Sequence, residues 1–246
     1  MSEPQSRQES EREFHDKLFG EGTQSRDEKV GKFYSVIEGS MDFYRDHINR
    51  NCKDNRVLDY GCGEGLWSFY MAERGAKVTA IDISEVAIEQ ARNCIDWRAM
   101  DAEDLDLPDD SFDMICGTSI LHHLDLEKCY REIARVLSPD GNAVFLEPMG
   151  HNPLINLYRK MTGNIRTKDE HPLRMQDLEL AERYFSSVET KFFHLLSLAS
   201  FPLRNFWFFK PLLKLLHAIE ARLFKLAPFL QKYSWMVVIK LSEPKK

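Results

Sequence analysis

A glycine-rich turn behind a short apolar run constrains the fold of this 246-residue chain more than any other feature. Residues 56–65 read Arg-Val-Leu-Asp-Tyr-Gly-Cys-Gly-Glu-Gly, and a helix-like segment, residues 66–72, follows at once. Val57 and Leu58 are typical of a buried parallel strand. Glycines let the backbone turn sharply and approach a ligand without side-chain collision. The stretch therefore predicts a strand, a tight ligand-binding turn and a helix N-terminus.

The spacing of the glycines distinguishes this turn from a dinucleotide-binding fingerprint. That fingerprint has glycine at the first, third and sixth places, and here the sixth place is Leu66. The glycines stand instead at 61, 63 and 65, behind Asp59. An Asp-x-Gly-x-Gly-x-Gly run resembles motif I of the class I S-adenosylmethionine-dependent methyltransferases. The alternative is a glycine-rich turn in another doubly wound sheet, so the rest of the chain must decide.

Two further predicted strands end on residues that could bind such a ligand. Residues 77–81 form an apolar strand that ends on Asp82, and residues 96–100 form another that ends at Asp101 and Ala102. Open parallel sheets bind ligands at the carboxyl ends of their strands. An acid at the end of the second strand can accept both ribose hydroxyls of a nucleoside. The resemblance implies that Asp101 meets the adenine amino group and that the amide of Ala102 meets the ring.

The next part of the chain extends the resemblance. Residues 111–118 predict a fourth strand whose Phe-Asp start and glycine end resemble motif IV. Asp125 is expected to cap a helix with one apolar stripe, and residues 138–141 to form a turn. Residues 142–146 predict the fifth strand, which ends at Glu-Pro. The run Glu-Ile-Ala-Arg-Val-Leu-Ser-Pro-Asp-Gly is close to the family pattern, and the co-occurrence of these matches favours the family.

The resemblance implies a fold, a cofactor and a set of cofactor-binding residues. The expected fold is α/β, a seven-stranded, mostly parallel, doubly wound sheet with helices on both faces and an antiparallel last strand. An N-terminal helical lid and a C-terminal helical cap complete it. The cofactor is S-adenosylmethionine, and the product is S-adenosylhomocysteine. Its expected ligands are Asp59, Gly61, Cys62, Gly63, Gly65, Asp82, Ile83, Asp101, Ala102, Gly117 and Thr118.

One continuous domain is expected, in three parts. Residues 1–52 hold a disordered N-terminus, up to Glu13, and two helices near 14–19 and 30–48. The second helix has one apolar stripe, Phe33, Ile37, Met41 and Tyr44. These helices form either a lid over the cofactor or a layer packed on the sheet. Residues 53–148 form the cofactor-binding core, and residues 149–246 form the acceptor side.

The acceptor side combines strands with an unusually apolar segment. An irregular insertion is expected at 150–172, a helix at 176–185, and the last two strands, an antiparallel hairpin, at 187–196 and 234–241. Between these strands, residues 201–230 carry a wide apolar arc. Its narrow polar line is Lys210, Lys214, His217 and Lys225, and its helices are expected to be cut by Pro202, Pro211 and Pro228. The segment is a buried cap, a wall of a hydrophobic acceptor pocket, or a helix on an anionic membrane surface.

Composition limits the partners and the compartment. Residues 191–246 hold ten Lys or Arg against two Glu, a balance of +8, so the net charge of −6 leaves −14 on residues 1–190. An acidic body argues against a general nucleic-acid-binding protein. The five cysteines form no Cys-x-x-Cys pair, which favours free thiols in a reducing compartment. Without an apolar signal segment or a run long enough to span a bilayer, a cytoplasmic location is expected, with possible peripheral membrane contact through 201–230.

The chemistry of methyl transfer requires alignment and, for a weakly acidic acceptor, a base. The candidate bases follow the fourth and fifth strands: His122, His123 and His151, with Glu147 and His171 also considered. A histidine in the Leu-His-His-Leu run could instead be structural. No acids or histidines show metal-ligand spacing, so no metal is expected. The Asn/Asp-Pro-Pro-aromatic motif of nucleic-acid base methyltransferases is absent after Thr118.

The sequence therefore predicts a methyltransferase that acts on a small hydrophobic acceptor, most readily at oxygen. One alternative is a carbon methyltransferase of a quinone or prenyl lipid at the membrane surface. Another is a non-catalytic protein that binds S-adenosylmethionine as a sensor.

Overall fold

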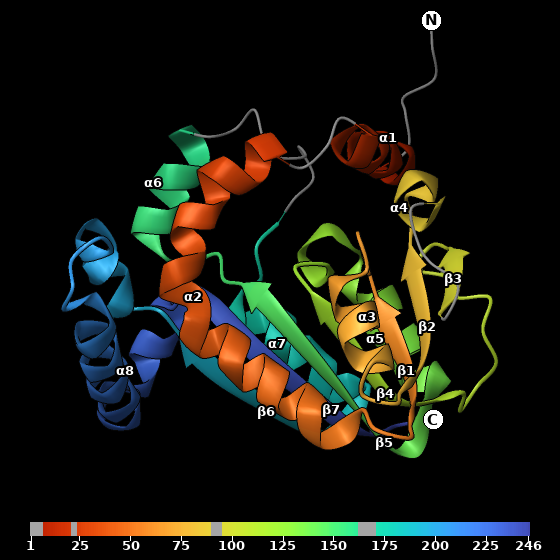
Figure 1. Cartoon of the computed structure of the whole chain (residues 1–246). Coiled ribbons are helices and arrows are strands. Elements are labelled where there is room, and N and C mark those ends of the chain that lie inside the picture. The colour runs from red at the N-terminus through yellow and green to blue at the C-terminus, as the bar shows by residue number, and fades with distance from the viewer. Residues whose placement is uncertain (1–6, 21–23, 90–94, 162–170) are drawn as a thin grey trace, which may run out of the picture.

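The apolar runs of the sequence pair into one sheet at the centre of the molecule (Figure 1). A computed structural model describes residues 7–20, 24–89, 95–161 and 171–246, and these residues form a seven-stranded sheet of order β3-β2-β1-β4-β5-β7-β6. The strands are β1 (Arg56–Tyr60), β2 (Lys77–Asp82), β3 (Asp96–Ala99), β4 (Phe112–Thr118), β5 (Leu137–Pro148), β6 (Phe185–Phe193) and β7 (Met236–Pro244).

The pairing of the strands determines where a ligand can bind. Strands β1 to β5 pair in parallel, whereas β7 runs antiparallel to both β5 and β6. The chain leaves β1 toward β2 and β3 on one side and returns to β4 on the other. This reversal opens a crevice at the carboxyl ends of β1 and β4, where doubly wound sheets bind ligands. The predicted α/β fold is confirmed, including the antiparallel hairpin at the sheet edge.

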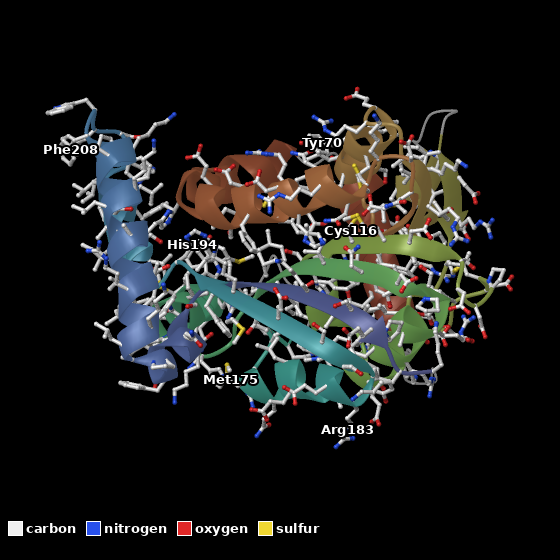
Figure 2. The ribbon with its side chains drawn as sticks, turned by 90° about the horizontal axis from the view of Figure 1, so that it is seen from below. Tyr70, Cys116, Met175, Arg183, His194 and Phe208 are labelled. Carbon is white, nitrogen blue, oxygen red and sulfur yellow. The ribbon has the colours of Figure 1, made fainter. Side chains whose placement is uncertain are left out.

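Helices cover both faces of the sheet and bury two apolar layers. On one face, α2 (Gln24–Asn51) and α3 (Leu66–Ala72) pack through residues such as Tyr44, Ile48 and Met71. The opposite face is covered by α5 (Leu126–Val136) and α7 (Met175–Leu180). Figure 2 shows α2 over the side of the sheet that carries Cys116, and the helix that begins at Met175 on the other side.

The helix α5 has the N-cap and the buried apolar stripe that its sequence predicts. The carboxylate of Asp125 accepts hydrogen bonds from the backbone amides of Glu127 and Lys128, at 3.1 and 3.4 Å, as an N-cap does. The apolar stripe of α5, which includes Cys129, Tyr130 and Ile133, is fully buried. Both the cap and the stripe confirm the prediction.

Three predictions about local structure are wrong. The helix α1 (Arg7–Gly20) includes residues 7–13, which were expected to be disordered, and residues 1–6 lie outside the described residues. The insertion at 150–172 contains a helix, α6 (Pro153–Met161), and its residues 162–170 are not described. The expected turn at 138–141 belongs to β5, which pairs Leu137 with Phe112 and absorbs the extra residues as a register shift.

Two other predicted features fall partly outside the described part of the chain. Of the helix after β2, α4 (Glu85–Glu89) is described, whereas residues 90–94, with Cys94, are not. The remaining four cysteines are free thiols. The side chain of Phe33 in the predicted stripe of α2 is likewise not described.

The apolar segment 201–230 forms η4 (Ser197–Leu203), the helix α8 (Phe209–Leu226) and η5 (Pro228–Tyr233). Pro211 lies in the first turn of α8, where a missing amide costs little, so it does not cut the helix as predicted. His217 does not join the exposed polar line. Its ring packs on α2, and a Cβ added to Gly39 would lie 2.7 Å from it. None of the described helices combines the length and hydrophobicity needed to cross a membrane.

One buried acid anchors α8 to the end of β6. The carboxylate of Glu220 is 3% exposed and accepts hydrogen bonds from the backbone amides of residues 194–196 at 2.7 to 2.8 Å. Figure 2 shows α8 at one side of the molecule, with Phe208 at its N-terminal end and His194 on its inner side. Because Glu220 points inward, the acid of α8 contributes no charge to its outer surface.

Candidate functional site

The glycine turn joins β1 to α3 at the carboxyl edge of the sheet. The backbone amides of Gly61 and Cys62 both donate to the carbonyl oxygen of Ile81 in β2, at 2.9 Å. Gly61, Gly63 and Gly65 have φ values of 76°, 50° and 77°, which L-residues rarely adopt. A Cβ at Gly65 would lie 2.2 Å from the ring of Trp97. The turn therefore requires glycine both for its backbone and for its neighbours.

Asp82, at the end of β2, is hydrogen-bonded to this turn. Its Oδ2 accepts from the amide of Gly63 at 2.8 Å, and its Oδ1 accepts from the amide of Ser84 at 3.0 Å. Each carboxylate oxygen can accept a second hydrogen bond. The predicted ribose acid and the glycine turn are thus brought together, and Ile83, the next residue, is half-buried beside them.

Asp59 lies beneath the turn. It is 2% exposed and accepts a hydrogen bond from the hydroxyl of Ser68 in α3. Burial raises the pKa of its carboxyl group to about 7, and the charge of Asp82 acts in the same direction. In this geometry Asp59 supports the turn from below and joins β1 to α3.

Asp101 and Ala102 follow β3 and contact the N-terminal helix. Asp101 accepts from the amide of Glu103 through Oδ1, at 2.9 Å, and from the side-chain amide of Gln8 through Oδ2, at 2.8 Å. Burial raises the pKa of the Asp101 carboxyl group. The carbonyl of Ala102 accepts from the hydroxyl of Tyr60. The amide of Gln8 therefore occupies the position at Asp101 that the resemblance assigns to the adenine amino group.

Helix α1 lies across this edge of the sheet, as a lid would (Figure 1). Arg7 donates to the backbone carbonyl of His123 at 2.7 Å and forms an ion pair with the buried Glu103. Further along the same helix, Asp16 accepts from the hydroxyl of Ser84 at 2.5 Å. The contacts of α1 thus reach the ends of β2, β3 and β4.

Gly117 and Thr118 close the far side of the crevice in β4. A Cβ at Gly117 would lie 2.8 Å from the carbonyl oxygen of Tyr60 and 2.9 Å from the ring of Phe145, so close packing explains this glycine. Thr118 is half-buried.

Cys62, in the glycine turn, is half-buried as well. Burial and the nearby charges of Asp59 and Asp82 raise the pKa of its thiol, so the thiol stays protonated at neutral pH.

A buried histidine and glutamate pair lies beside the crevice. Nδ1 of His122 is 2.7 Å from Oε2 of Glu147, and the two residues are 4% and 0% exposed. The other carboxylate oxygen of Glu147 accepts from the backbone amides of Ile120 and Leu121, at 2.8 and 2.9 Å. A Cβ at Gly61 would lie 2.6 Å from Ile120, so the glycine turn and this pair are neighbours. Glu147 therefore acts as the partner of His122, a role that the sequence alone did not reveal.

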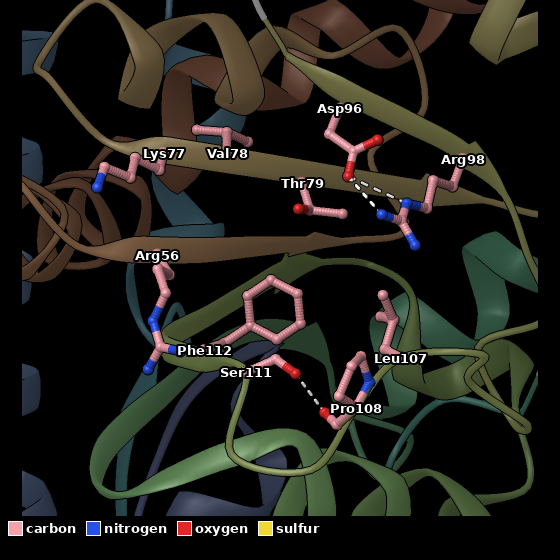
Figure 3. A pocket seen from close by; sticks show the side chains of 10 residues that line it. All are labelled: Arg56, Lys77, Val78, Thr79, Asp96, Arg98, Leu107, Pro108, Ser111 and Phe112. Atoms are coloured by element: carbon pink, nitrogen blue, oxygen red, sulfur yellow. Dashed lines mark hydrogen bonds and ion pairs between the residues drawn. The ribbon is translucent and has the colours of Figure 1, made fainter.

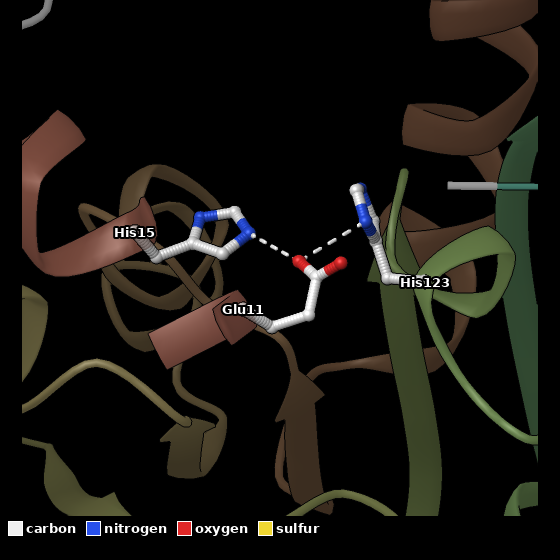
Figure 4. A group of neighbouring side chains, drawn as sticks. All are labelled: Glu11, His15 and His123. Carbon is white, nitrogen blue, oxygen red and sulfur yellow. Dashed lines mark ion pairs between the residues drawn. The ribbon is translucent and has the colours of Figure 1, made fainter. Parts of the chain in front are cut away.

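The other candidate bases differ in their surroundings. Burial first, and then the charges of Arg174 and Lys232, lower the pKa of His151, whose Nε2 is buried without a hydrogen-bond partner among the described residues. His171 is exposed, and its amide donates to the carbonyl of His122 at 3.0 Å. His123 lies next to Glu11 and His15 of α1 (Figure 4).

A shallow cavity of about 550 Å³ opens at the opposite edge of the sheet (Figure 3). Its wall contains the first residues of β1, β2, β3 and β4, namely Arg56, Lys77, Asp96 and Phe112. Arg56 and Arg98 in this wall are paired with Asp113 and Asp96. The cavity lies at the amino ends of the strands, away from the crevice, so it is not the candidate site.

We predict that the buried Asp59 makes stability depend on pH. Folding raises the pKa of the Asp59 carboxyl group from 3.8 to about 7. Below pH 4 this group is protonated in both the folded and the unfolded protein and does not destabilise the fold. As the pH rises through 7, the buried carboxyl group must ionise, and the folded protein loses stability relative to the unfolded chain. The variant Asp59→Asn should therefore gain stability over the natural protein between pH 4 and pH 8, by at most about 4 kcal/mol. Urea unfolding at several pH values measures this difference.

The control for this experiment is Asp113→Asn. Arg56 lowers the pKa of Asp113, so its stabilisation is present at neutral pH and is lost in acid. The control should show the opposite trend. A pH-independent difference between Asp59→Asn and the natural protein would show that Asp59 is ionised throughout.

Comparison with known proteins agrees with this geometry. A family model described as a methyltransferase domain matches residues 58–145. The ubiquinone biosynthesis O-methyltransferase of Pseudomonas aeruginosa (strain LESB58) is 35% identical over 113 residues, 42% of this chain and 48% of the relative. The biotin biosynthesis bifunctional protein BioHC of Cellvibrio japonicus is 30% identical over 146 residues, 57% of this chain and 28% of the relative. The match thus spans less than half the length of these curated relatives.

A solved structure extends the likeness to the whole fold. Phosphoethanolamine N-methyltransferase 2 of Haemonchus contortus, in complex with phosphomonomethylethanolamine and S-adenosylhomocysteine, has a TM-score of 0.64 at 15% identity. The alignment covers 100% of this chain and 62% of that one. At this identity the likeness concerns the fold alone. Together, the glycine turn, the sheet order and the family match identify residues 58–145 as a methyltransferase domain of the class I S-adenosylmethionine-dependent type.

Proposed function

We propose that the protein transfers a methyl group from S-adenosylmethionine to the oxygen of a small hydrophobic acceptor. The observation that carries this proposal is the buried pair of His122 and Glu147 beside the glycine turn. A base in this position is useful for an acceptor that must lose a proton, such as a phenol or an alcohol. The name of the Pseudomonas relative, an O-methyltransferase, supports the same reaction.

The residues at the crevice fit S-adenosylmethionine. Three glycines with positive φ keep the turn open to a ligand, and Asp82 offers a carboxylate beside it. Asp101 already accepts a hydrogen bond from an amide, Gln8, in the place proposed for the adenine amino group. When bound, the cofactor supplies an electrophilic methyl group on a sulfonium. We assign the ribose hydroxyls to Asp82 and the adenine to Asp101 and Ala102.

Glu147 orients His122 for proton transfer. A carboxylate can only accept, so Nδ1 of His122 carries the hydrogen in this pair and Nε2 carries the basic lone pair. With cofactor and acceptor bound, Nε2 of His122 would take the proton of the acceptor hydroxyl, and the sulfonium would supply the methyl group to that oxygen and become a neutral thioether. The buried carboxylate stabilises the imidazolium that results. Holding the two reactants in line contributes further, up to roughly 7 to 11 kcal/mol.

The hydrophobic acceptor is supported by the surface of the acceptor side. Among the described residues, nine of the ten exposed large apolar side chains lie in α6 or in residues 206–229. We name the second group the apolar-basic surface: its apolar members are Phe206, Trp207, Leu215, Ile219, Leu226 and Phe229, and its basic members are Lys210, Lys214, Arg222 and Lys225. Asn152, just before α6, donates to the carbonyl of Tyr233 at 2.7 Å, so α6 adjoins this surface through η5.

We propose that the apolar-basic surface contacts an anionic membrane from which the acceptor is drawn. Apolar side chains flanked by lysines and arginines suit the interface of such a membrane. The acid of α8, Glu220, is buried and does not oppose the attraction. This contact keeps the second candidate function open, carbon methylation of a quinone or prenyl lipid. NMR of the product of a labelled methyl donor separates the two, because oxygen-bound and carbon-bound methyl groups have different chemical shifts.

The direct test of the proposed function is a screen of lipid and metabolite extracts with labelled S-adenosylmethionine. A labelled product that depends on the protein supports a methyltransferase. Tight binding of the cofactor without turnover of any extract would instead favour the sensor.

We predict that Asp82→Ala weakens S-adenosylmethionine binding by about 10- to 150-fold, because a charge-assisted hydrogen bond is worth about 1.5 to 3 kcal/mol. Calorimetric titration measures the affinity, and circular dichroism checks the fold. Asp106→Ala, in the exposed acidic loop, is the control and should bind normally. An unchanged affinity in folded Asp82→Ala would remove Asp82 from the cofactor site.

We predict that His122→Asn lowers kcat by about 10²- to 10⁴-fold while cofactor affinity is retained. Glu147→Gln should also lower kcat, because its amide would donate toward Nδ1 of His122 and force the wrong tautomer. A variant with the natural kcat would show that alignment alone suffices.

We predict that the triple variant Lys210→Glu, Lys214→Glu, Lys225→Glu loses binding to anionic liposomes by at least about 100-fold, since each basic residue is worth about 1 kcal/mol there. The matched control reverses three exposed charges elsewhere, at Lys53, Lys77 and Arg131. Co-sedimentation with anionic and zwitterionic vesicles measures the effect. Equal loss in both triple variants would show a general effect of net charge.

A further inference from the structure

We propose that Glu11, His15 and His123 bind one divalent transition-metal ion that fastens the lid helix α1 to the core. Their ligand atoms, one carboxylate oxygen and two imidazole nitrogens, all lie within 4.8 Å of one another. Figure 4 shows the carboxylate of Glu11 between the two rings, with His15 on the same helix and His123 reaching it from the core. This site does not depend on the identity of the methyl acceptor.

The distances fit ligands of a common ion better than they fit hydrogen bonds. Oε2 of Glu11 is 3.5 Å from Nε2 of His15 and 3.4 Å from Nδ1 of His123. Charge-assisted hydrogen bonds between such atoms are about 2.7 to 2.9 Å long. In a tetrahedral zinc site with bonds of about 2.0 to 2.1 Å, neighbouring ligand atoms are about 3.3 to 3.4 Å apart. The two separations from Glu11, 3.5 and 3.4 Å, are close to this distance between neighbouring zinc ligands.

The chemistry of the three residues suits such an ion. Two neutral imidazoles and one carboxylate are the protein ligands of zinc sites that keep a fourth position open. Glu11 is 6% exposed, and Nδ1 of His123 is buried and makes no hydrogen bond among the described residues. The negative charge of the buried Glu11 carboxylate would attract a divalent cation to this position. The imidazole rings of His15 and His123 stand edge-on to each other, with 5.7 Å between their centroids. In this arrangement Nε2 of His15 and Nδ1 of His123 both point toward the carboxylate of Glu11 (Figure 4).

The position of the cluster gives the ion a structural consequence. Glu11 and His15 are one helical turn apart on α1, whereas His123 ends η1 (Leu121–His123), directly after His122. Arg7 of the same helix already donates to the carbonyl of His123, and Gln8 contacts Asp101. An ion at this point would therefore hold α1 closed over the cofactor crevice. The expectation that no metal is needed came from spacing along the chain, which cannot show a cluster joined across the fold.

Metal titration of the untagged, chelator-treated protein tests the proposal. Calorimetry with Zn²⁺ should show one site per chain, and Co²⁺ should give the visible absorption of a four-coordinate ion. Glu11→Gln, His15→Asn and His123→Asn should each weaken Zn²⁺ binding by more than about 100-fold. Replacing a residue that only hydrogen-bonds to a metal ligand already lowers metal affinity by about 10- to 100-fold, and these three residues would be the ligands themselves. His171→Asn, an exposed histidine outside the cluster, is the control and should bind as the natural protein does.

Hydrogen exchange supplies the second measurement. Zn²⁺ should slow the exchange of the α1 amides in the natural protein and leave it unchanged in Glu11→Gln. Binding of S-adenosylhomocysteine by each variant checks that the crevice is folded and separates this proposal from the proposed function. The proposal is overturned if the natural protein takes up no stoichiometric Zn²⁺. It is also overturned if all three variants bind the ion as the control does, which would place the ion elsewhere.

Discussion

The hydrogen bond from the amide of Gly63 to the carboxylate of Asp82 joins the two strand ends on which the site depends. It fixes a turn whose glycines have positive φ, and it keeps an acid beside that turn. Below it, the buried Asp59 connects β1 to α3 through Ser68. A ligand-binding edge in a parallel sheet requires strand ends that are held in register. Asp82 holds the turn after β1 to the end of β2, and Asp59 holds β1 to α3.

The second half of the site is organised by another buried carboxylate. Glu147, at the end of β5, accepts hydrogen bonds from two amides after β4 and from His122. A single side chain thus sets the path of η1, the tautomer of the histidine and its distance from the glycine turn. The same short helix ends at His123, so the proposed base and the proposed metal site share one rigid element. Lid position and proton transfer would then be linked through adjacent residues.

The sequence predicted the sheet, the cap at Asp125 and the clustering of Asp82 with the glycines because each is a local pattern with a short-range cause. It predicted the second half of α1 but not residues 7–13, since these residues have no apolar side chain. Contacts from Arg7 and Gln8 to the strand ends stabilise that helix, and such tertiary contacts override composition. The partnership of Glu147 with His122, and the approach of Glu11 to His123, likewise join segments far apart in the chain.

We propose that the cofactor binds at the crevice between β1 and β4, under the lid α1. A crystal structure of the protein with S-adenosylhomocysteine would show whether it does. We expect the ribose hydroxyls on Asp82, the amino acid portion along the turn of Gly61 to Gly65, and the adenine at Asp101 with Gln8 displaced. A nucleoside bound at the opposite edge of the sheet, around Arg56 and Lys77, would contradict it.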